Sequence, residues 1–389
     1  MSTQHIPVAD VVIIGGGIAG VSIGYELAAR CRVILLEMES TLAYHTTGRS
    51  AATWLATYGN HPIRALTRAS REFFLNPPPI FESALTKPLG LVYVGGPGQS
   101  DQVRELHDTV RELTPDVRLI DAAEAVAINP MLRPERVELA LTEPGALDVD
   151  VHELHTGFTR GLRSRGGIVV RAAKAVSADL RDGIWTMATG DGGTYRARTV
   201  VNAAGAWSDE VGTLFGAQPI GIVPLRRSIF MVPGETVPAH LPLTIAIDGS
   251  YYFKADGDQC LCSPHDETPQ LPGDAKPDEL EIARAIEAIN EATRLNIRHV
   301  RSSWAGLRSF APNHAPVVGP DPGVEGLFWF AGQGGYGIQI APAAARLGAA
   351  LILGDHMPAD ILASGCNPAD LDPARLARSV GQARRGSDL

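Results

Sequence analysis

The sequence has 389 residues, a formal net charge of −9 at pH 7, 45% hydrophobic residues and 20% charged residues. This length favours more than one domain, and this composition is typical of a soluble α/β enzyme and excludes a disordered or fibrous chain. The acidic balance argues against a nucleic-acid-binding protein. No apolar run is long enough for a transmembrane segment, and the N-terminal stretch MSTQHIPVAD lacks the basic and apolar regions of a signal peptide.

The four cysteines are scattered and form no C-x-x-C pair: Cys31, Cys260, Cys262 and Cys366. Cys260 and Cys262 fall in an expected strand with both side chains on one face, where small core residues are a better interpretation than a metal or disulfide site. We therefore expect no metal, reduced thiols and a cytoplasmic location. Peripheral contact with the inner membrane stays open.

The stretch from Val11 to Glu37 has the order strand, glycine-rich turn, helix, strand and acid. The expected elements are a strand over Val11–Ile14, a helix over Val21–Arg30 and a strand over Arg32–Leu36. Between the first two, Gly15, Gly17 and Gly20 fit the pattern G-x-G-x-x-G. This context predicts a dinucleotide-binding site, although the motif alone does not separate FAD from NAD.

Each glycine of this motif has a physical role, and so does the acid that follows the second strand. Gly15 makes the tight turn, Gly17 lets a pyrophosphate approach the backbone, and Gly20 lets the helix lie close to the sheet. The helix N-terminus offers free N–H groups and a positive dipole end to the phosphates. Glu37, roughly 20 residues after Gly15, can accept both ribose hydroxyls and argues against a 2′-phosphate.

Further elements follow along the chain. A loop over residues 40–59 carries Arg49 and enters a helix near Ser50, whose hydroxyl is a candidate N-cap. Helices are expected over Ile63–Phe74, Asp101–Leu113, Asp121–Ile128, Val151–Arg165 and Asp278–Leu295, the last with Leu280, Ala283, Ile286 and Ile289 on its apolar face. Strands are expected over Leu89–Val94, Gly167–Val170, Gly183–Met187, Arg198–Gly205, Ile220–Pro233, Ser250–Lys254, Arg301–Ala311 and Gly326–Ala331.

Two of the later segments end in small residues. The strand over Arg198–Gly205 ends Ala203-Ala204-Gly205, which lets the backbone pass close to a cofactor, with tight strand packing as the alternative. The segment from Gly332 to Gln339 is a glycine-rich turn aimed into a helix that continues through Leu353. Such a turn presents a helix N-terminus to an anion or a dipole.

Taken together, these motifs carry a resemblance that covers nearly the whole chain. In order they are G-x-G-x-x-G, Glu37, T-G-R-S-A-A, N-A-A-G-A-W, P-x-R-R-S, W-A-G-L-R-S-F and G-Q-G-G-Y-G-I-Q. The chain resembles the FAD-dependent D-amino-acid oxidase and glycine oxidase superfamily, and most closely the bacterial D-arginine dehydrogenase-like D-amino-acid dehydrogenases.

The resemblance implies an α/β fold: a Rossmann-type FAD-binding domain with an inserted α+β substrate domain that carries a mixed sheet. We expect the FAD-binding domain in residues 1–85, 145–220 and 315–389, and the substrate-binding domain in residues 86–144 and 221–314. The FAD is expected to be non-covalent, because no cysteine lies near the C-terminal glycine turn. The implied cofactor-binding residues are Gly15, Gly17, Ile18, Ala19, Gly20, Glu37, Met38, Thr47, Gly48, Arg49, Ser50, Ala51, Ala52, Ala204, Gly205, Trp207, Gly306, Gly334, Gly335, Tyr336, Gly337, Ile338 and Gln339.

The resemblance also implies a substrate site over one face of the flavin. Arg227 and Arg308 would hold the substrate carboxylate, which the fork of a guanidinium group matches. Tyr58 and Tyr252 would line the site and close it over the substrate. Gly306 and Gln339 would touch the substrate or the flavin. The alternatives are a domain-bridging ion pair for Arg308 and a surface charge for Arg226 or Arg227, of which Arg227 is the preferred ligand.

The chain departs from the dehydrogenase pattern at two positions. Thr53 stands where the family has a histidine, and Leu89, or Gly90 if the alignment shifts, stands where the family has the glutamate that receives a basic side chain. A buried guanidinium without a carboxylate partner would cost several kcal/mol. We therefore expect a neutral or apolar substrate side chain rather than arginine.

The expected reaction is FAD-dependent oxidation of a D-amino acid by hydride transfer to flavin N5, followed by hydrolysis of the imino acid to a 2-oxo acid and ammonia. No residue is an evident strong base for a carbon acid, and Thr53 at most positions the amine or a water molecule. The electron acceptor stays open between oxygen and a quinone of the respiratory chain. The alternatives are a flavoenzyme for a secondary amine or a 2-hydroxy acid, an NAD-linked dehydrogenase, and a flavin-binding redox scaffold without catalysis.

Overall fold

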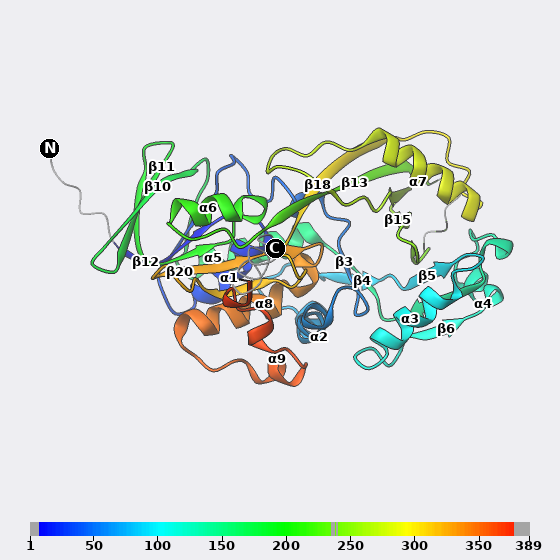
Figure 1. The fold of residues 1–389 in the computed structure, drawn as a ribbon, viewed down its shortest axis with the longest axis horizontal. Helices are drawn as coiled ribbons and strands as arrows, with labels where there is room; N and C mark the ends of the chain where they lie inside the picture. Colours follow the sequence, from blue (N-terminus) through cyan, green and yellow to red (C-terminus); the bar gives the residue numbers. More distant parts are fainter. Residues whose placement is uncertain (1–7, 235–237, 239, 377–389) are drawn as a thin grey trace, which may run out of the picture.

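The computed structural model describes residues 8–234, 238 and 240–376 (Figure 1). Most of the stretch in which we expected no signal peptide, residues 1–7, and the end of the expected cofactor domain, residues 377–389, lie outside this part. The described strands form an eight-stranded, a ten-stranded and a three-stranded sheet. Figure 1 shows the eight-stranded sheet with most of the long helices on one side of the view, and the ten-stranded sheet with α7, α3 and α4 on the other.

The eight-stranded sheet has β1 at its centre, paired in parallel with β2 and β12. Its strands are β1 (Val8–Ile14), β2 (Val33–Leu36), β9 (Ile168–Val170), β10 (Ala175–Arg181), β11 (Ile184–Thr189), β12 (Thr194–Asn202), β19 (Val317–Pro320) and β20 (Leu327–Ala331). The expected strand, glycine turn, helix and strand near the N-terminus are confirmed, with helix α1 (Ile18–Leu27) beginning and ending three residues earlier than expected. An added Cβ at Gly20 would lie 1.8 Å from the Gly15 carbonyl oxygen, so only glycine lets α1 lie this close to the sheet.

The other helices are α2 (His61–Leu75), α3 (Ser100–Val110), α4 (Ala122–Ile128), α5 (Val151–Ser164), α6 (Ser208–Leu214), α7 (Glu279–Ala292), α8 (Gly337–Leu353) and α9 (Ala359–Ala363). The prediction of a helix that begins near Ser50 is wrong. Ser50 follows a short 3-10 helix (Thr47–Arg49) in extended conformation, and its hydroxyl accepts a hydrogen bond from Ala52 N. The next helix, α2, begins only at His61, where Asn60 is the N-cap.

The ten-stranded sheet is mixed, because β14 pairs in parallel with β5 while the other described pairs are antiparallel. Its strands are β5 (Leu91–Gly95), β6 (Arg118–Ile120), β7 (Leu139–Glu143), β13 (Val223–Pro233), β14 (Leu243–Ala246), β15 (Tyr252–Asp256), β16 (Gln259–Ser263), β17 (Thr268–Pro269), β18 (Ser302–Phe310) and β21 (Gln333–Gly334). The three-stranded sheet joins β3 (Thr53–Trp54), β8 (Leu147–Val149) and β4 (Thr86–Pro88). An α/β fold with mixed sheets is therefore confirmed.

The two faces of the ten-stranded sheet have different partners. Residues alternate between the faces along each strand. On one face, Phe230, Phe253, Cys260 and Cys262 pack with α7 in a single apolar cluster. α7 turns Ile282, Ala285 and Ile289 into this cluster, whereas Leu280, expected on the apolar face, is 60% exposed. The other face looks toward the eight-stranded sheet and carries the residues described below.

The strands of the two large sheets come from different parts of the chain. The eight-stranded sheet uses residues 8–36, 168–202 and 317–331, and the ten-stranded sheet uses residues 91–143, 223–310 and 333–334. Two pairings join segments that we expected in different domains: β21 pairs with β18, and β4 pairs with β8. The domain boundaries stay a prediction.

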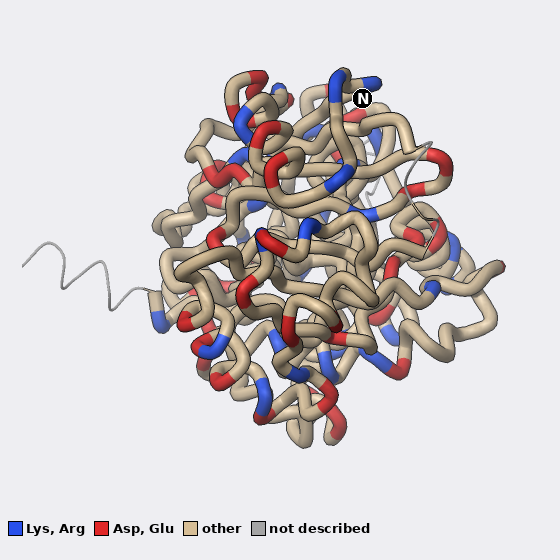
Figure 2. Tube along the Cα trace, turned by 90° about the vertical axis from the view of Figure 1, so that its right-hand side faces the viewer, with Lys and Arg blue, Asp and Glu red and all other residues tan. Residues whose placement is uncertain are grey.

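Figure 2 shows Lys and Arg residues interspersed with Asp and Glu residues on the side in view. Among the described residues, none of the helices is both long and apolar enough to cross a membrane.

Candidate active site

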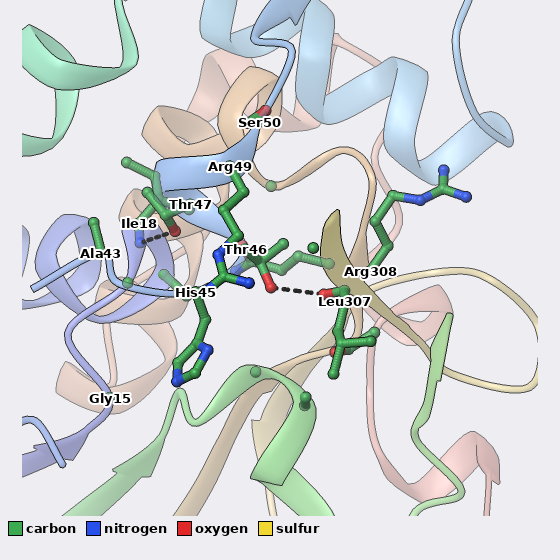
Figure 3. A pocket seen from close by; sticks show the side chains of 18 of the residues that line it. Gly15, Ile18, Ala43, His45, Thr46, Thr47, Arg49, Ser50, Leu307 and Arg308 are labelled. Carbon is green, nitrogen blue, oxygen red and sulfur yellow. Dashed lines mark hydrogen bonds between the residues drawn. The ribbon is translucent and has the colours of Figure 1, made fainter. Parts of the chain in front are cut away.

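A cavity of about 520 Å³ lies between the carboxyl ends of the central strands of the eight-stranded sheet and one face of the ten-stranded sheet. Its wall is built from the glycine turn after β1, the loop before β3, strands β13, β14, β15 and β18, and the N-terminus of α8. Figure 3 shows part of this wall, with Gly15 and Ile18 from the first region and Leu307 and Arg308 from β18. In doubly wound sheets, the carboxyl ends of the strands are the usual ligand site.

The glycine turn after β1 brings its backbone to the cavity wall. Gly15 has a φ of +113°, and an added Cβ would lie 2.4 Å from the Ala203 carbonyl oxygen. The N-cap of α1, Gly17, has no side chain to bond the first N–H groups. Ile18 N donates to Thr47 Oγ1 at 3.0 Å (Figure 3). The carboxylate of Glu37 accepts from Gly16 N at 2.6 Å and from Glu39 N at 2.8 Å.

The loop before β3 connects the glycine turn to β18. Thr46 Oγ1 donates to the Leu307 carbonyl oxygen at 2.6 Å (Figure 3), and Arg49 Nη1 donates to the Ala305 carbonyl oxygen at 2.9 Å. Arg49 Nη2 also donates to Asp274 at 2.6 Å. Hydrogen bonds from Lys276 and Arg49 lower the pKa of Asp274 to about 2. Arg49 therefore lines the cavity and also ties this loop to the ten-stranded sheet.

Two buried guanidinium groups line the opposite wall. Arg227 on β13 pairs in register with Gly306 on β18, so Arg308, two residues on, lies on the same face. One oxygen of Glu267 accepts from Arg308 Nη2 at 2.7 Å and from Arg227 Nη2 at 3.2 Å. Arg308 Nη1 donates to the Tyr58 hydroxyl at 3.3 Å. Two cations thus share one carboxylate, which leaves one positive charge uncompensated at the cavity wall.

The neighbouring Arg226 lies on the other face of β13. It donates to Asp266 at 3.0 Å and to Asp278 at 2.8 Å, and it does not line the cavity. Burial and the charge of Arg308 lower the pKa of Arg227, as expected for two cations held in a shared site. The acid paired with Arg308, Glu267, lies in the loop between β16 and β17, and both residues fall within the expected substrate-binding domain.

His265 is a cavity residue whose charge state the surroundings fix. Its ring meets the Tyr252 ring edge to face, with centroids 5.6 Å apart. Burial, together with the charges of Arg227 and Arg308, lowers the pKa of His265 to about 2. The imidazole is therefore neutral at ordinary pH and adds no positive charge beside the arginine pair.

This depressed pKa predicts a pH-dependent stability. An unfolded histidine titrates near pH 6.5, so the unfolded chain binds more protons below that pH, and stability falls as the pH falls. We expect His265→Asn to flatten the acid limb of the unfolding curve between pH 6.5 and 4.5 by up to about 1.4 kcal/mol per pH unit. Urea unfolding at several pH values measures this, with His107→Gln on the surface of α3 as control. An unchanged acid limb in His265→Asn would contradict the assignment.

The sequence model of the DAO family, described as FAD dependent oxidoreductase, matches residues 10–351. The chain belongs to this family. It is therefore an FAD-dependent oxidoreductase, and its cofactor is FAD.

Relatives and solved structures agree with this membership. The chain is 26% identical to mitochondrial dimethylglycine dehydrogenase of Mus musculus over 95% of its length, but spans only 44% of that protein. It is 25% identical to glycine oxidase of Geobacillus kaustophilus over 96% of its length and 98% of the relative. The crystal structure of that glycine oxidase has a TM-score of 0.78 at 23% identity, covering 90% of this chain and 95% of the other. L-proline dehydrogenase from P.horikoshii has a TM-score of 0.81 at 20% identity, covering 96% and 99%.

The cavity wall fits FAD. The N-termini of α1 and α8 both reach the cavity, and neither is capped by the side chain of its own N-cap residue. They can face a pyrophosphate and the polar edge of a flavin ring. The Glu37 carboxylate lies on the wall where the ribose hydroxyls of a dinucleotide would be bound. Five Lys and Arg side chains line the cavity against two carboxylates, Glu37 and Glu210, which suits an anionic cofactor and an anionic substrate.

Most of the residues expected at the site lie together on the cavity wall. They are Gly15, Gly17, Ile18, Ala19, Glu37, Met38, Thr47, Arg49, Ser50, Ala51, Ala52, Thr53, Tyr58, Ala204, Gly205, Trp207, Arg227, Tyr252, Gly306, Arg308, Gly334, Gly335, Gly337, Ile338 and Gln339. Their roles stay predictions. Gln339 uses its amide inside the protein: it donates to Thr67 Oγ1 at 2.7 Å and accepts from Leu55 N at 3.4 Å.

Four expected residues do not line the cavity. Gly20 and Gly48 face backbone oxygens of Gly15 and Ala43, so their role is close packing of the chain. Tyr336 packs against Tyr58, with ring centroids 4.7 Å apart. Leu89 was expected in the substrate pocket, but it does not line the cavity, and its side chain packs against the apolar cluster that contains Leu91 and Tyr93.

Sequence reasoning missed several residues of the wall. The missed residues include Ile229, Leu243, Ile245 and Lys254. Each of them lies two positions from another cavity residue on the same strand, and therefore on the same face of the sheet. This spacing is the signal that could have found them. Glu143, on β7, lies outside the cavity and anchors the loop that carries Tyr58. Its carboxylate accepts from Ala56 N at 2.7 Å and from Thr57 Oγ1 at 2.6 Å, and burial raises its pKa.

Proposed function

We propose that this enzyme oxidises D-amino acids to imino acids, which hydrolyse to 2-oxo acids and ammonia. The observation that carries the proposal is the pair of buried guanidinium groups, Arg227 and Arg308, on the wall of the same cavity that suits FAD. They share one carboxylate, Glu267, whose side chain is 48% exposed. A substrate carboxylate would supply the missing negative charge through charge-assisted hydrogen bonds.

FAD, when bound, supplies the acceptor for the hydride of the substrate Cα–H. The protein binds and orients the substrate. Arg227 and Arg308 would hold the α-carboxylate, and the hydroxyl of Tyr58, 3.3 Å from Arg308 Nη1, would close the site beside it. The carboxylates on the wall are Glu37 and Glu210, and Glu37 is engaged by Gly16 N. Neither contacts the arginine pair, and Glu267, which does, is held by both guanidinium groups and does not line the cavity. We therefore propose that the substrate reacts as the free amine without a protein base.

The expected preference for a neutral or apolar side chain rested on Leu89, which does not line the cavity. Support for excluding a basic side chain comes instead from the excess of cations on the wall. A D-arginine side chain would bring a further positive charge into this cavity without a free carboxylate to receive it. We propose a substrate whose side chain carries no positive charge.

A second candidate function is oxidation of an N-substituted amino acid or a 2-hydroxy acid. The names of the relatives, dimethylglycine dehydrogenase and glycine oxidase, favour a small amine with an α-carboxylate. The arginine pair would serve these substrates as well, because it binds the carboxylate that all of them share.

Product analysis separates these functions. The FAD-loaded enzyme is incubated with an electron-accepting dye and, in turn, with D-amino acids, their L-enantiomers, N-methylated glycines and 2-hydroxy acids. We expect a 2-oxo acid and ammonia in equal amounts from D-amino acids only. Formaldehyde from the N-methylated glycines, with no 2-oxo acid from D-amino acids, would favour the second candidate and contradict the first.

We also propose that FAD is bound non-covalently. None of Cys31, Cys260, Cys262 and Cys366 lines the cavity. Precipitation of the protein with acid should therefore release the yellow flavin into the supernatant. Flavin retained in the pellet would contradict the proposal.

Gly306 provides a test of how closely ligands approach the wall. An added Cβ there would lie 3.5 Å from Arg49 Cβ and 3.7 Å from Thr46 Cα, which is ordinary contact, so packing of the protein alone does not require glycine. We expect Gly306→Ala to keep the thermal stability of the apoprotein but to slow flavin reduction at least tenfold. In the control Gly212→Ala, the Cβ would lie 2.2 Å from Trp329, and overpacking should cost about 1–3 kcal/mol of stability. Unchanged flavin reduction in Gly306→Ala would show that no ligand approaches here.

A further inference from the structure

Lys254 is a buried cation on the cavity wall that the proposed chemistry does not use. It lies on β15, two residues after Tyr252, so both side chains point to the same face of the ten-stranded sheet. Tyr252 and Lys254 both line the cavity, and Lys254 is only 4% exposed. A buried ammonium group is costly unless its hydrogen-bond donors are paired.

The protein pairs Lys254 only in part. Among the described residues, its one hydrogen-bond acceptor is the Asp148 carboxylate, on β8. An ammonium group has three donors, so two are left for a water molecule or a ligand in the cavity. Asp148 is moreover shared, because Lys87 Nζ lies 3.2 Å from its other oxygen. Lys254, which lines the cavity, therefore keeps donors that have no protein acceptor among the described residues.

The cavity thus has two separate cationic groups. Arg227 and Arg308 share Glu267, and Lys254 shares Asp148 with Lys87. Strand register separates the groups: Lys254 pairs with Leu261, and Leu261 pairs with Met231, four residues beyond Arg227 on β13. Two strand spacings and four residues correspond to roughly 16 Å between the Cα atoms of Arg227 and Lys254. Arg227 and Lys254 both line the cavity from these positions.

The wall between the two groups is apolar. Ile229 follows Arg227 on the same face of β13, toward the level of Lys254. Ile245, on β14, lies beyond β15 and extends this apolar surface past Tyr252, its partner in register. Both residues line the cavity. A ligand that is anionic at its two ends and apolar in its middle would match this order of surfaces.

We propose that Lys254 determines specificity by binding a second carboxylate of the substrate. The substrate class is then D-amino acids with an acidic side chain, whose α-carboxylate is held by the arginine pair and whose distal carboxylate is held by Lys254. This inference rests on the proposed function for the identity of the reacting amine. The second carboxylate binds independently of whether that amine is oxidised.

Binding of unreactive dicarboxylates to the FAD-loaded protein tests the proposal without turnover. Calorimetric titrations compare malonate, succinate, glutarate and adipate with propionate, butyrate, pentanoate and hexanoate, which have the same chain lengths and one carboxylate. We expect at least one dicarboxylate to bind tenfold or more tightly than its matched monocarboxylate. In Lys254→Met we expect this ratio to fall below about threefold, while monocarboxylate affinity stays unchanged.

Two further variants keep the test decisive. Lys254→Met leaves Asp148 without its buried partner, so Lys254→Met/Asp148→Asn removes both charges and should show the same loss of preference in a folded protein. Lys87 is the other cation beside Asp148, and its side chain is 71% exposed. Lys87→Met should therefore keep the preference for dicarboxylates.

Three results would overturn the proposal: no dicarboxylate preference in the wild type, a preference that survives in both Lys254 variants, or an equal loss of both ligand series, which would place Lys254 at the flavin instead. If the dicarboxylate preference is present but no D-amino acid is oxidised, the proposed function fails and the Lys254 site stands.

Discussion

Arg227→Met should lower kcat/KM for the substrate by about a thousandfold. The substitution removes one of the two guanidinium groups proposed to hold the α-carboxylate. Hydrogen bonds to charged groups contribute about 1.5–3 kcal/mol each, and two of them together amount to roughly 4 kcal/mol, or a thousandfold. Steady-state kinetics with the best substrate measure the loss, and calorimetry with a monocarboxylate should show the same loss of binding.

The matched control for this prediction is the adjacent residue in the sequence. Arg226 has the same side chain but lies on the opposite face of β13, where it pairs with Asp266 and Asp278. Arg226→Lys keeps the charge at those carboxylates and should leave kcat/KM within about threefold. Equal losses in Arg227→Met and Arg226→Lys would mean that Arg227 acts through the fold and does not bind substrate.

Glu37→Ala should weaken FAD binding by a factor of about a hundred to a thousand. Its carboxylate lines the cavity at the carboxyl end of β2 and accepts hydrogen bonds from Gly16 N and Glu39 N. The variant loses charge-assisted bonds to the ribose hydroxyls and frees two donors of the turn, each worth about 1.5–3 kcal/mol. Titration of the apoprotein with FAD, followed by the quenching of flavin fluorescence, measures the dissociation constant.

Glu39→Gln is the control for the cofactor prediction. Glu39 lies two residues further along, pairs with His45 at 2.9 Å and does not line the cavity. We expect its FAD affinity to stay within about threefold of the wild type. Normal FAD affinity in Glu37→Ala would remove Glu37 from the cofactor site.

The parts of the fold that the sequence could predict are those fixed by local patterns. The order from Val11 to Glu37 specified two buried strands, the turn and α1, because the glycines and the apolar runs act within a few residues of one another. The expected helix start at Val151 is confirmed in α5, where the side chain of the N-cap residue Asp150 accepts from Glu153 N. The prediction of a helix at Ser50 failed because a hydroxyl that can cap a helix can equally accept a hydrogen bond within a turn. Here the Ser50 hydroxyl accepts from Ala52 N.

The site residues were found where a motif marks them and missed where only the sheet brings them together. Arg227 was chosen over Arg226 by resemblance, and strand alternation places Arg227 on the cavity face. Lys254 and Asp148 are more than a hundred residues apart, and their contact depends on how β15 meets the three-stranded sheet. No local pattern encodes that contact. Leu89 lies between β4 and β5, where its N–H donates to the Ala146 carbonyl oxygen, and its side chain packs against the cluster that contains Leu91. These contacts come from chain segments far apart in the sequence.

Anaerobic reduction of the bound flavin in a single turnover, with D-amino acids, their L-enantiomers and the corresponding D-amino acid amides, tests most directly whether Arg227 and Arg308 bind the substrate carboxylate. We expect rapid bleaching of the flavin absorbance by D-amino acids, and bleaching at least a hundredfold slower by the L-enantiomers and by the amides, which lack the carboxylate that the arginine pair binds. Equal rates for the acid and the amide, or bleaching by L-amino acids only, would contradict this expectation.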